Sequence, residues 1–252
     1  MSFIDWIKDT NNPELPKAEY LYNARHIIVL CIVAVLCVAL SLIFAKRSEK
    51  TKLLVLRIGA GILLFFEIVT RIVNLIICED YSLANIAEII LPMHICSVMV
   101  WIFIIAIFTR QQTLINFATV GGLLATLAFL LYPAVGLNKV YMSFTCIYST
   151  VSHMIGFIMA ILLMTLGFAK FEFKDIWKVF VCFAIMFAYG ALLDFVIFPG
   201  ADYMYLRYDP LELNLPFPHH FLYGPILIAY ITLFYFIYWL SHRKKSTKKK
   251  TT

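Results

Sequence analysis

Two residues in the apolar part of this sequence have side chains suited to covalent chemistry, Cys96 and His153. A thiol becomes a good nucleophile when a neighbouring base or cation yields the thiolate, and an imidazole is such a base. Both residues lie inside long apolar runs, where polar groups are costly and are usually paired or functional. We therefore treat Cys96 and His153 as a candidate nucleophile and base.

His94 is a second candidate imidazole, two residues before Cys96. Two residues correspond to about 200° around an ideal helix, so the two side chains face opposite sides. Unless Pro92 distorts the first turn, His94 and Cys96 cannot both line one site. His94 is kept as a candidate catalytic residue without an assigned role.

Other polar residues of the apolar runs are candidates for substrate binding. Glu67, Arg71 and Asn74 are spaced so that they lie on one stripe of a helix. Glu67 and Arg71 are most simply an i, i+4 ion pair. The candidate substrate-binding residues are Glu67, Arg71, Asn74, Asp194 and, in a later loop, Arg207.

Most of these side chains are expected at a similar depth in the membrane. At 1.5 Å per residue, Arg71 lies roughly 9 Å and Asp194 roughly 6 Å below the outer ends of their helices. Cys96 and His153 fall roughly 10–15 Å inside by the same measure. The pattern predicts a cavity that opens towards the outer leaflet.

The elements that position these residues are transmembrane helices. Of the 252 residues, 62% are hydrophobic and 14% are charged, against about a quarter charged in a soluble domain. A helix needs about 20 mostly apolar residues to cross a bilayer. We predict an all-α, polytopic bundle that forms a single integral membrane domain over residues 1–252. Its seven helices are expected at about 26–45, 53–77, 86–108, 113–132, 143–169, 176–198 and 220–240.

The loops alternate in charge, which predicts the orientation. Segments 46–52, 109–112, 170–178 and 241–252 carry fourteen Lys and Arg residues, whereas the N-terminal segment and the other loops carry five. Because positive loops remain in the cytoplasm, we expect the N-terminus outside and the C-terminus inside. The tail 241–252 is a cytoplasmic basic segment suited to anionic lipid headgroups, and no nucleic-acid partner is expected.

The sequence lacks the motifs that are typical of metal-binding, nucleotide-binding and redox-cofactor proteins. The six cysteines have no CxxC spacing, so no metal site is expected. No glycine loop for nucleotides and no nicotinamide or flavin fingerprint occurs, so no cofactor is expected. The polar N-terminal segment is unlike a signal peptide. The simplest localisation is a multi-pass protein of a bacterial plasma membrane.

The run Leu91-Pro92-Met93-His94-Ile95-Cys96 resembles that of the YwaF-like bacterial membrane proteins, relatives of animal transmembrane protein 164. His153 and the Asp202–Arg207 loop add to the resemblance, which spans roughly residues 60–240. The animal relatives are regarded as acyltransferases that remodel phospholipids through a cysteine and a histidine. The resemblance implies that Cys96 is the acyl-accepting nucleophile and His153 its general base.

Three functions remain open at this point. The first is a phospholipid acyltransferase with an acyl-thioester intermediate, in which Arg71 or Arg207 holds the lipid phosphate. The second is a small-solute or proton-coupled transporter, although we find no inverted repeat. The third is a seven-helix receptor or a non-catalytic lipid-binding scaffold, for which membrane lipids are the expected partners.

Overall fold

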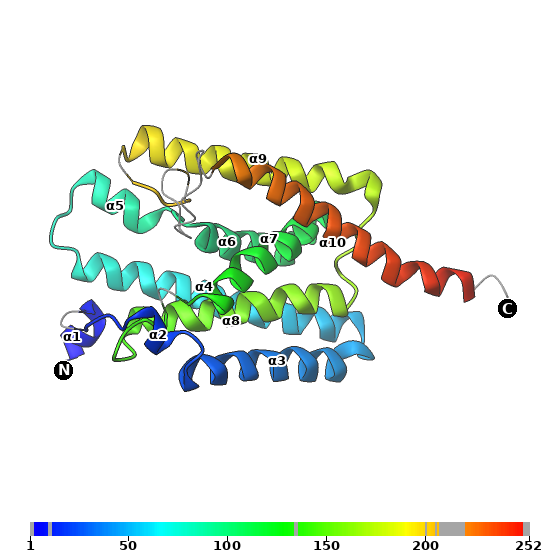
Figure 1. Cartoon of the computed structure of the whole chain (residues 1–252), viewed down its shortest axis with the longest axis horizontal. Coiled ribbons are helices and arrows are strands. Elements are labelled where there is room, and N and C mark those ends of the chain that lie inside the picture. Colours follow the sequence, from blue (N-terminus) through cyan, green and yellow to red (C-terminus); the bar gives the residue numbers. More distant parts are fainter. Residues whose placement is uncertain are drawn as a thin grey trace. The chain divides into compact units, whose positions relative to one another are not determined.

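The computed structural model describes residues 3–9, 12–133, 136–199, 201–204, 206 and 220–248. These residues form helices and turns, with no strand beyond one isolated bridge between Glu14 and Lys139 (Figure 1). The helices are α1 (Phe3–Lys8), α2 (Lys17–Tyr20), α3 (Ala24–Ala45), α4 (Glu49–Ile77), α5 (Leu83–Ile90), α6 (Ile95–Thr109), α7 (Gln112–Leu131), α8 (Phe144–Thr165), α9 (Ile176–Leu192) and α10 (His220–Lys248). A 3-10 turn, Phe173–Asp175, precedes α9, and a π-helical turn, Leu193–Ile197, follows it.

Six helices of the described chain are long and apolar enough to cross a membrane, and a seventh span is obtained if α5 and α6 are counted together. The prediction of an all-α polytopic bundle is therefore confirmed. Most helices begin and end near the expected residues, but α10 continues to Lys248, beyond the expected end at residue 240. Residues 241–248 of the basic tail are thus helical.

The expected continuous helix over 86–108 is instead broken. It consists of α5 and α6, bent by 54° across residues 91–94. Pro92 has no backbone N–H and disfavours helical geometry at the preceding residue. Leu91 accordingly has extended geometry, with φ −75° and ψ 147°. Cys96 therefore becomes the second residue of a new helix.

The chain forms two compact units. The first contains residues 1–92 and 96–168, and the second contains residues 93–95 and 169–252. In the first unit, α8 packs against α3, α4 and α7 (Figure 1). Glycine permits two of these close approaches, since a Cβ at Gly59 would lie 2.3 Å from Met159 Sδ and one at Gly156 would lie 2.8 Å from Thr126 Cγ2. The core of the unit lies mainly on α7 and α8, whose facing side chains are buried.

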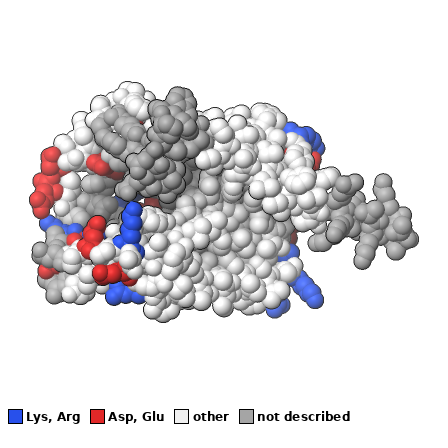
Figure 2. Space-filling view, in the orientation of Figure 1, with Lys and Arg blue, Asp and Glu red and all other residues white. Residues whose placement is uncertain are grey.

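Charged side chains of the first unit gather at its two ends (Figure 2). At one end, Lys8 binds Glu79 at 2.9 Å and Lys139 binds Glu14 at 3.0 Å. At the other, Arg110 pairs with Glu49. The uncharged surface between the ends is what a helix bundle presents to lipid chains.

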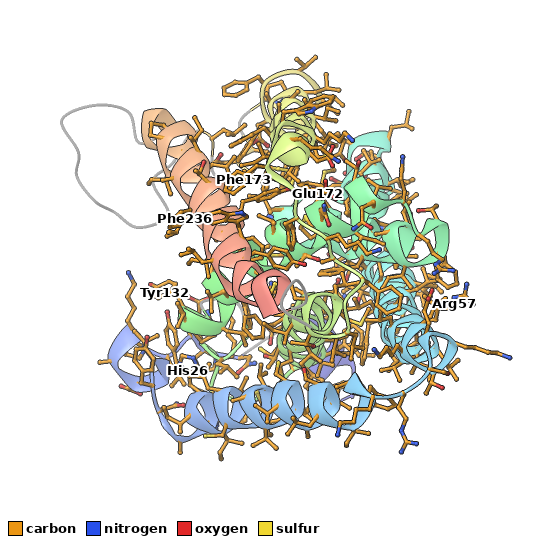
Figure 3. All side chains as sticks on the ribbon, turned by 90° about the vertical axis from the view of Figure 1, so that its right-hand side faces the viewer. His26, Arg57, Tyr132, Glu172, Phe173 and Phe236 are labelled. Atoms are coloured by element: carbon orange, nitrogen blue, oxygen red, sulfur yellow. The ribbon has the colours of Figure 1, made fainter. Side chains whose placement is uncertain are left out.

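The second unit is held together by aromatic contacts between the segment before α9 and the helix α10. The Phe171 ring lies about edge-on to Phe234 and Tyr235, with centroids 5.0 and 5.1 Å away. The Phe173 ring, labelled in Figure 3, has its centroid 6.2 Å from that of Tyr235 and 6.4 Å from that of Trp239. Such aromatic pairs add to the burial of their apolar surface.

Candidate functional site

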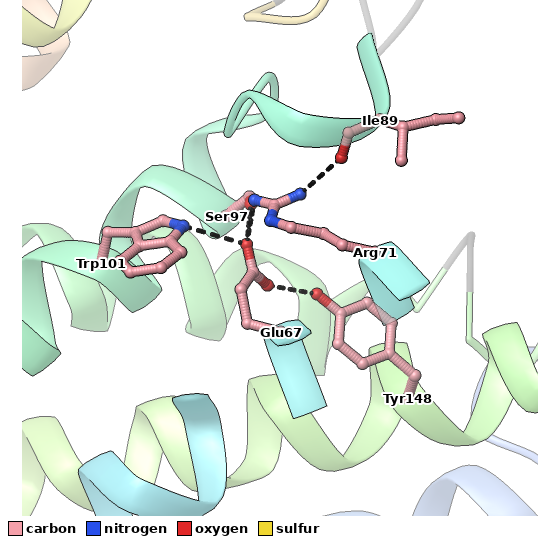
Figure 4. Close-up of polar contacts among 6 residues, drawn as sticks. All are labelled: Glu67, Arg71, Ile89, Ser97, Trp101 and Tyr148. Atoms are coloured by element: carbon pink, nitrogen blue, oxygen red, sulfur yellow. Dashed lines mark hydrogen bonds and ion pairs between the residues drawn. The ribbon is translucent and has the colours of Figure 1, made fainter. Parts of the chain in front are cut away.

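Glu67 of α4 is a buried carboxylate with four hydrogen-bond donors (Figure 4). Its Oε1 accepts from Arg71 Nη2 at 2.5 Å, from Ser97 Oγ at 2.7 Å and from Trp101 Nε1 at 3.2 Å. Its Oε2 accepts from Tyr148 OH at 2.7 Å. Three helices, α4, α6 and α8, thus supply the partners that a buried charge requires.

Arg71 forms the predicted i, i+4 ion pair with Glu67 and also reaches α5. Its Nη1 donates to the carbonyl oxygen of Ile89 at 2.8 Å. Among the described residues, Arg71 Nε and the buried Thr70 Oγ1 have no hydrogen-bond partner. The side chain of Asn74, further along the same stripe, makes no hydrogen bond to the described part of the chain. Arg71 Nη1 and Nη2 are both bonded to the protein, and the role of Arg71 towards substrate stays a prediction.

Cys96 lies in the first turn of α6, where backbone N–H groups have no partner within the helix. Its Sγ is 3.9 Å from the carbonyl oxygen of Ala125 on α7, a weak contact. The positive end of the helix dipole favours negative charge at this position, which suits a thiolate.

His153 is held in one orientation by two contacts. Its Nδ1 lies 2.6 Å from the carbonyl oxygen of Ser149, one turn earlier on α8. A carbonyl oxygen only accepts, so Nδ1 carries a hydrogen, and in the neutral ring Nε2 has the free lone pair. The ring is stacked on Phe129 of α7 with centroids 3.8 Å apart and planes 12° apart. This geometry presents Nε2 as a proton acceptor.

Cys96 and His153 contact neighbouring turns of the same helix. Cys96 meets Ala125 and His153 meets Phe129, and these two residues are one turn apart on α7. No hydrogen bond joins the thiol to the imidazole in the described structure. The structure therefore places both candidates in the region where α6, α7 and α8 meet, without direct contact between them.

His94 and Asp194 meet elsewhere, in the second unit, where both bind the backbone of Tyr203. His94 Nδ1 lies 3.0 Å from the Tyr203 carbonyl oxygen, and the Tyr203 N–H donates to Asp194 Oδ1 at 3.0 Å. Asp194 is fully buried in the π-helical turn, whereas His94 is exposed. Both side chains hold the loop that follows α9. Arg207 lies outside the described residues.

Sequence reasoning missed Ser97, Trp101 and Tyr148. Ser97 and Trp101 are spaced i, i+4, so a polar stripe facing α4 was present in the sequence. Nothing in the spacing of Tyr148 indicates its carboxylate partner, because that contact depends on how α8 packs against α4. Glu67 therefore has more hydrogen-bond partners than the i, i+4 ion pair alone predicted.

Taken together, the apolar helices and the buried polar groups define a polytopic membrane protein with a cluster of buried polar side chains. The model of the TMEM164 family matches residues 21–243, which is most of the sequence. The chain belongs to the TMEM164 family, as the resemblance predicted. No curated protein and no solved structure shows a significant match to it.

Proposed function

We propose that this protein is a phospholipid acyltransferase that uses Cys96 as nucleophile and His153 as general base. The observation that carries the proposal is the arrangement on α7: a thiol in the first turn of α6 and an imidazole with a free Nε2 lie against neighbouring turns. The family match adds the expectation of this chemistry. Membrane lipids are then the substrates, and the setting is a bacterial cell membrane.

The reaction has two steps. In the first, His153 Nε2 takes the thiol proton, Cys96 Sγ bonds to the acyl carbonyl carbon, and the ester C–O bond breaks. The departing lysophospholipid oxygen takes the proton from His153. In the second, an acceptor hydroxyl gives its proton to Nε2 and attacks the thioester, and the C–S bond breaks. The thiolate then recovers the proton, so nothing is oxidised or reduced.

The N-terminus of α6, close to Cys96, favours negative charge along this path. The N–H groups of the first turn of α6, which have no acceptor within the helix, stabilise negative charge on the sulfur. The same groups suit the oxyanion of the tetrahedral intermediate. His153 enters the reaction in a fixed tautomer, because Ser149 accepts the Nδ1 hydrogen. A base oriented in this way needs little rearrangement before proton transfer.

The test is a covalent label. Detergent-purified wild type and Cys96→Ala are incubated with an alkyne-tagged phospholipid, and a hydroxylamine-sensitive acyl adduct is sought. We expect a labile label on the wild type, none on Cys96→Ala and slower labelling of His153→Ala. Cys31→Ala is the matched control, because Cys31 is an exposed thiol of α3 that has no part in the proposal. Equal labelling of wild type and Cys96→Ala overturns the proposal, as does no label with several donor lipids in folded protein.

A further inference from the structure

The Glu67–Arg71 pair bridges the break between α5 and α6. Arg71 Nη1 binds the carbonyl oxygen of Ile89, which belongs to the last turn of α5 and has no partner within that helix. Glu67 Oε1 binds Ser97 and Trp101, in the first two turns of α6. Two residues one turn apart on α4 therefore fix the helix ends on both sides of the interrupted segment (Figure 4).

The hydrogen bonds that Glu67 and Arg71 make across the break are strong ones. Each joins a buried or half-buried charged group to a polar partner, with distances between 2.5 and 3.2 Å. Hydrogen bonds to charged groups are about twice as strong as neutral ones. Removing a partner also leaves the remaining charge poorly compensated in a buried site. The broken span is thus held rigidly at the place where its own backbone hydrogen bonds are interrupted.

Cys96 lies directly between these attachments. It follows the break by two residues and precedes Ser97, whose hydroxyl bonds Glu67. The orientation of the first turn of α6 consequently depends on Glu67. A shift of about 1 Å in a reacting group is enough to slow a reaction by about a hundredfold.

We infer that Glu67 and Arg71 are positioning residues for the reactive thiol, which act through Ser97 and Ile89 and not by touching substrate. The inference rests on the proposed function for its catalytic meaning. Its physical content, that the carboxylate sets the exposure and orientation of the Cys96 thiol, is independent of turnover. It is therefore tested on the thiol itself.

Two hydroxyls offer a matched comparison. Ser97 Oγ and Tyr148 OH each donate to Glu67 at 2.7 Å, but Ser97 lies on the helix of Cys96 and Tyr148 lies on α8. They also bond different carboxylate oxygens. If Glu67 positions the α6 turn, loss of the Ser97 hydroxyl disturbs Cys96 more than loss of the Tyr148 hydroxyl.

The experiment measures the second-order rate of Cys96 alkylation by a small maleimide, read by mass spectrometry of the Cys96 peptide. We expect Ser97→Ala and Glu67→Gln to lower this rate by about tenfold, the size expected for a lost hydrogen bond to a charged group. Ser97→Thr keeps a hydroxyl and restores most of the rate, and Tyr148→Phe lowers it less than Ser97→Ala. Ser41→Ala, which removes an exposed hydroxyl bonded to Thr165, is the neutral control.

Alkylation of Ser97→Ala at the wild-type rate overturns the inference, and so does an equal effect of Tyr148→Phe. Thermal unfolding identifies variants that fail to fold, and if Glu67→Gln is one of them, the Ser97→Ala and Ser97→Thr pair decides alone. The two proposals fail separately. Absence of the acyl label in the wild type removes the acyltransferase, whereas a normal alkylation rate in Ser97→Ala removes only the positioning role.

Discussion

His26 and Leu130 join the first transmembrane helix to the end of α7: His26 Nε2 lies 2.7 Å from the Leu130 carbonyl oxygen. The His26 side chain is buried on α3, and its Nδ1 accepts from the Tyr22 N–H at 2.9 Å. Nδ1 is therefore the acceptor and Nε2 carries the hydrogen. Since the last carbonyls of a helix have no partner within it, His26 satisfies one that α7 leaves open.

Loss of this imidazole should destabilise the first unit. His26→Ala removes two hydrogen bonds and leaves a cavity, so we expect the free energy of unfolding in detergent to fall by about 2–4 kcal/mol. Ser41→Ala, which removes one exposed interhelical hydrogen bond on the same helix, should cost less than 1 kcal/mol, about the average for such bonds in membranes. Equal losses for the two variants would contradict the role of His26.

The stack between Phe129 and His153 should matter for the rate of acylation. Phe129→Leu removes the ring that lies 3.8 Å from the imidazole, so we expect the acyl label to form about tenfold more slowly. In a His153→Ala background the same substitution should add little, because the two changes disturb one interaction. Additive effects, measured in the double-mutant cycle, would show that Phe129 acts independently of His153.

Two helical glycines should respond in opposite ways to alanine. A Cβ at Gly122 would lie 2.3 Å from Phe103 Cζ, in a buried contact between α6 and α7, whereas one at Gly61 meets nothing within 4 Å. Overpacking by Gly122→Ala should cost about 1–3 kcal/mol. Gly61→Ala should be neutral or stabilising by up to about 1 kcal/mol, because alanine has the higher helix propensity. Thermal unfolding of both variants checks the pair.

Ionisation of Tyr20 should lower the stability of the fold at high pH. Burial, followed by its Tyr132 neighbour, raises the pKa of Tyr20 from 10.0 to about 12. The unfolded chain therefore loses this proton at lower pH than the folded chain, and the stability contributed by Tyr20 is lost between pH 10 and about 12. The midpoint temperature of thermal unfolding should fall more steeply across this pH range for the wild type than for Tyr20→Phe. Tyr141→Phe, at an exposed ring, should keep the wild-type slope.

The predicted orientation is testable with single cysteines. In a background without the six native cysteines, Glu79→Cys and Lys50→Cys place thiols at opposite ends of α4. With the N-terminus outside, a membrane-impermeant maleimide should label the Glu79→Cys protein in intact cells and the Lys50→Cys protein only after permeabilisation. The reverse pattern would show that the charge difference between the loops does not set the topology.

Local features of the fold were predictable, and contacts between helices were not. The apolar runs predicted helices long enough to span a membrane, and the i, i+4 spacing predicted the Glu67–Arg71 pair, since both follow from helix geometry. Pro92 was noted as a source of distortion, but the apolar run around it predicted a continuous helix. The bend of 54° arises because the proline interrupts hydrogen bonding that hydrophobicity alone does not report.

In the candidate site, the sequence indicates the reactive side chains and the Glu67–Arg71 pair, but not their other contacts. Cys96 and His153 stand out as side-chain types, and in the structure they contact neighbouring turns of α7. The tautomer of His153 and the bonding of Tyr148 to Glu67 depend on backbone and helix packing, so a linear sequence carries no signal for them. The contacts of His94 with the Tyr203 loop were missed for the same reason.

The packing of α3 has a consequence for how the protein is made. Its main partner in the first unit is α8, with which it shares the hydrogen bond between Ser41 and Thr165. About 100 residues separate the end of α3 from the start of α8, which a ribosome takes about 5–20 s to synthesise. During that interval α3 has lipid as its chief neighbour, and it has no charged residue between Ile27 and Ala45. Its uniform apolar surface suits a helix that enters the bilayer before α8, its partner, has been synthesised.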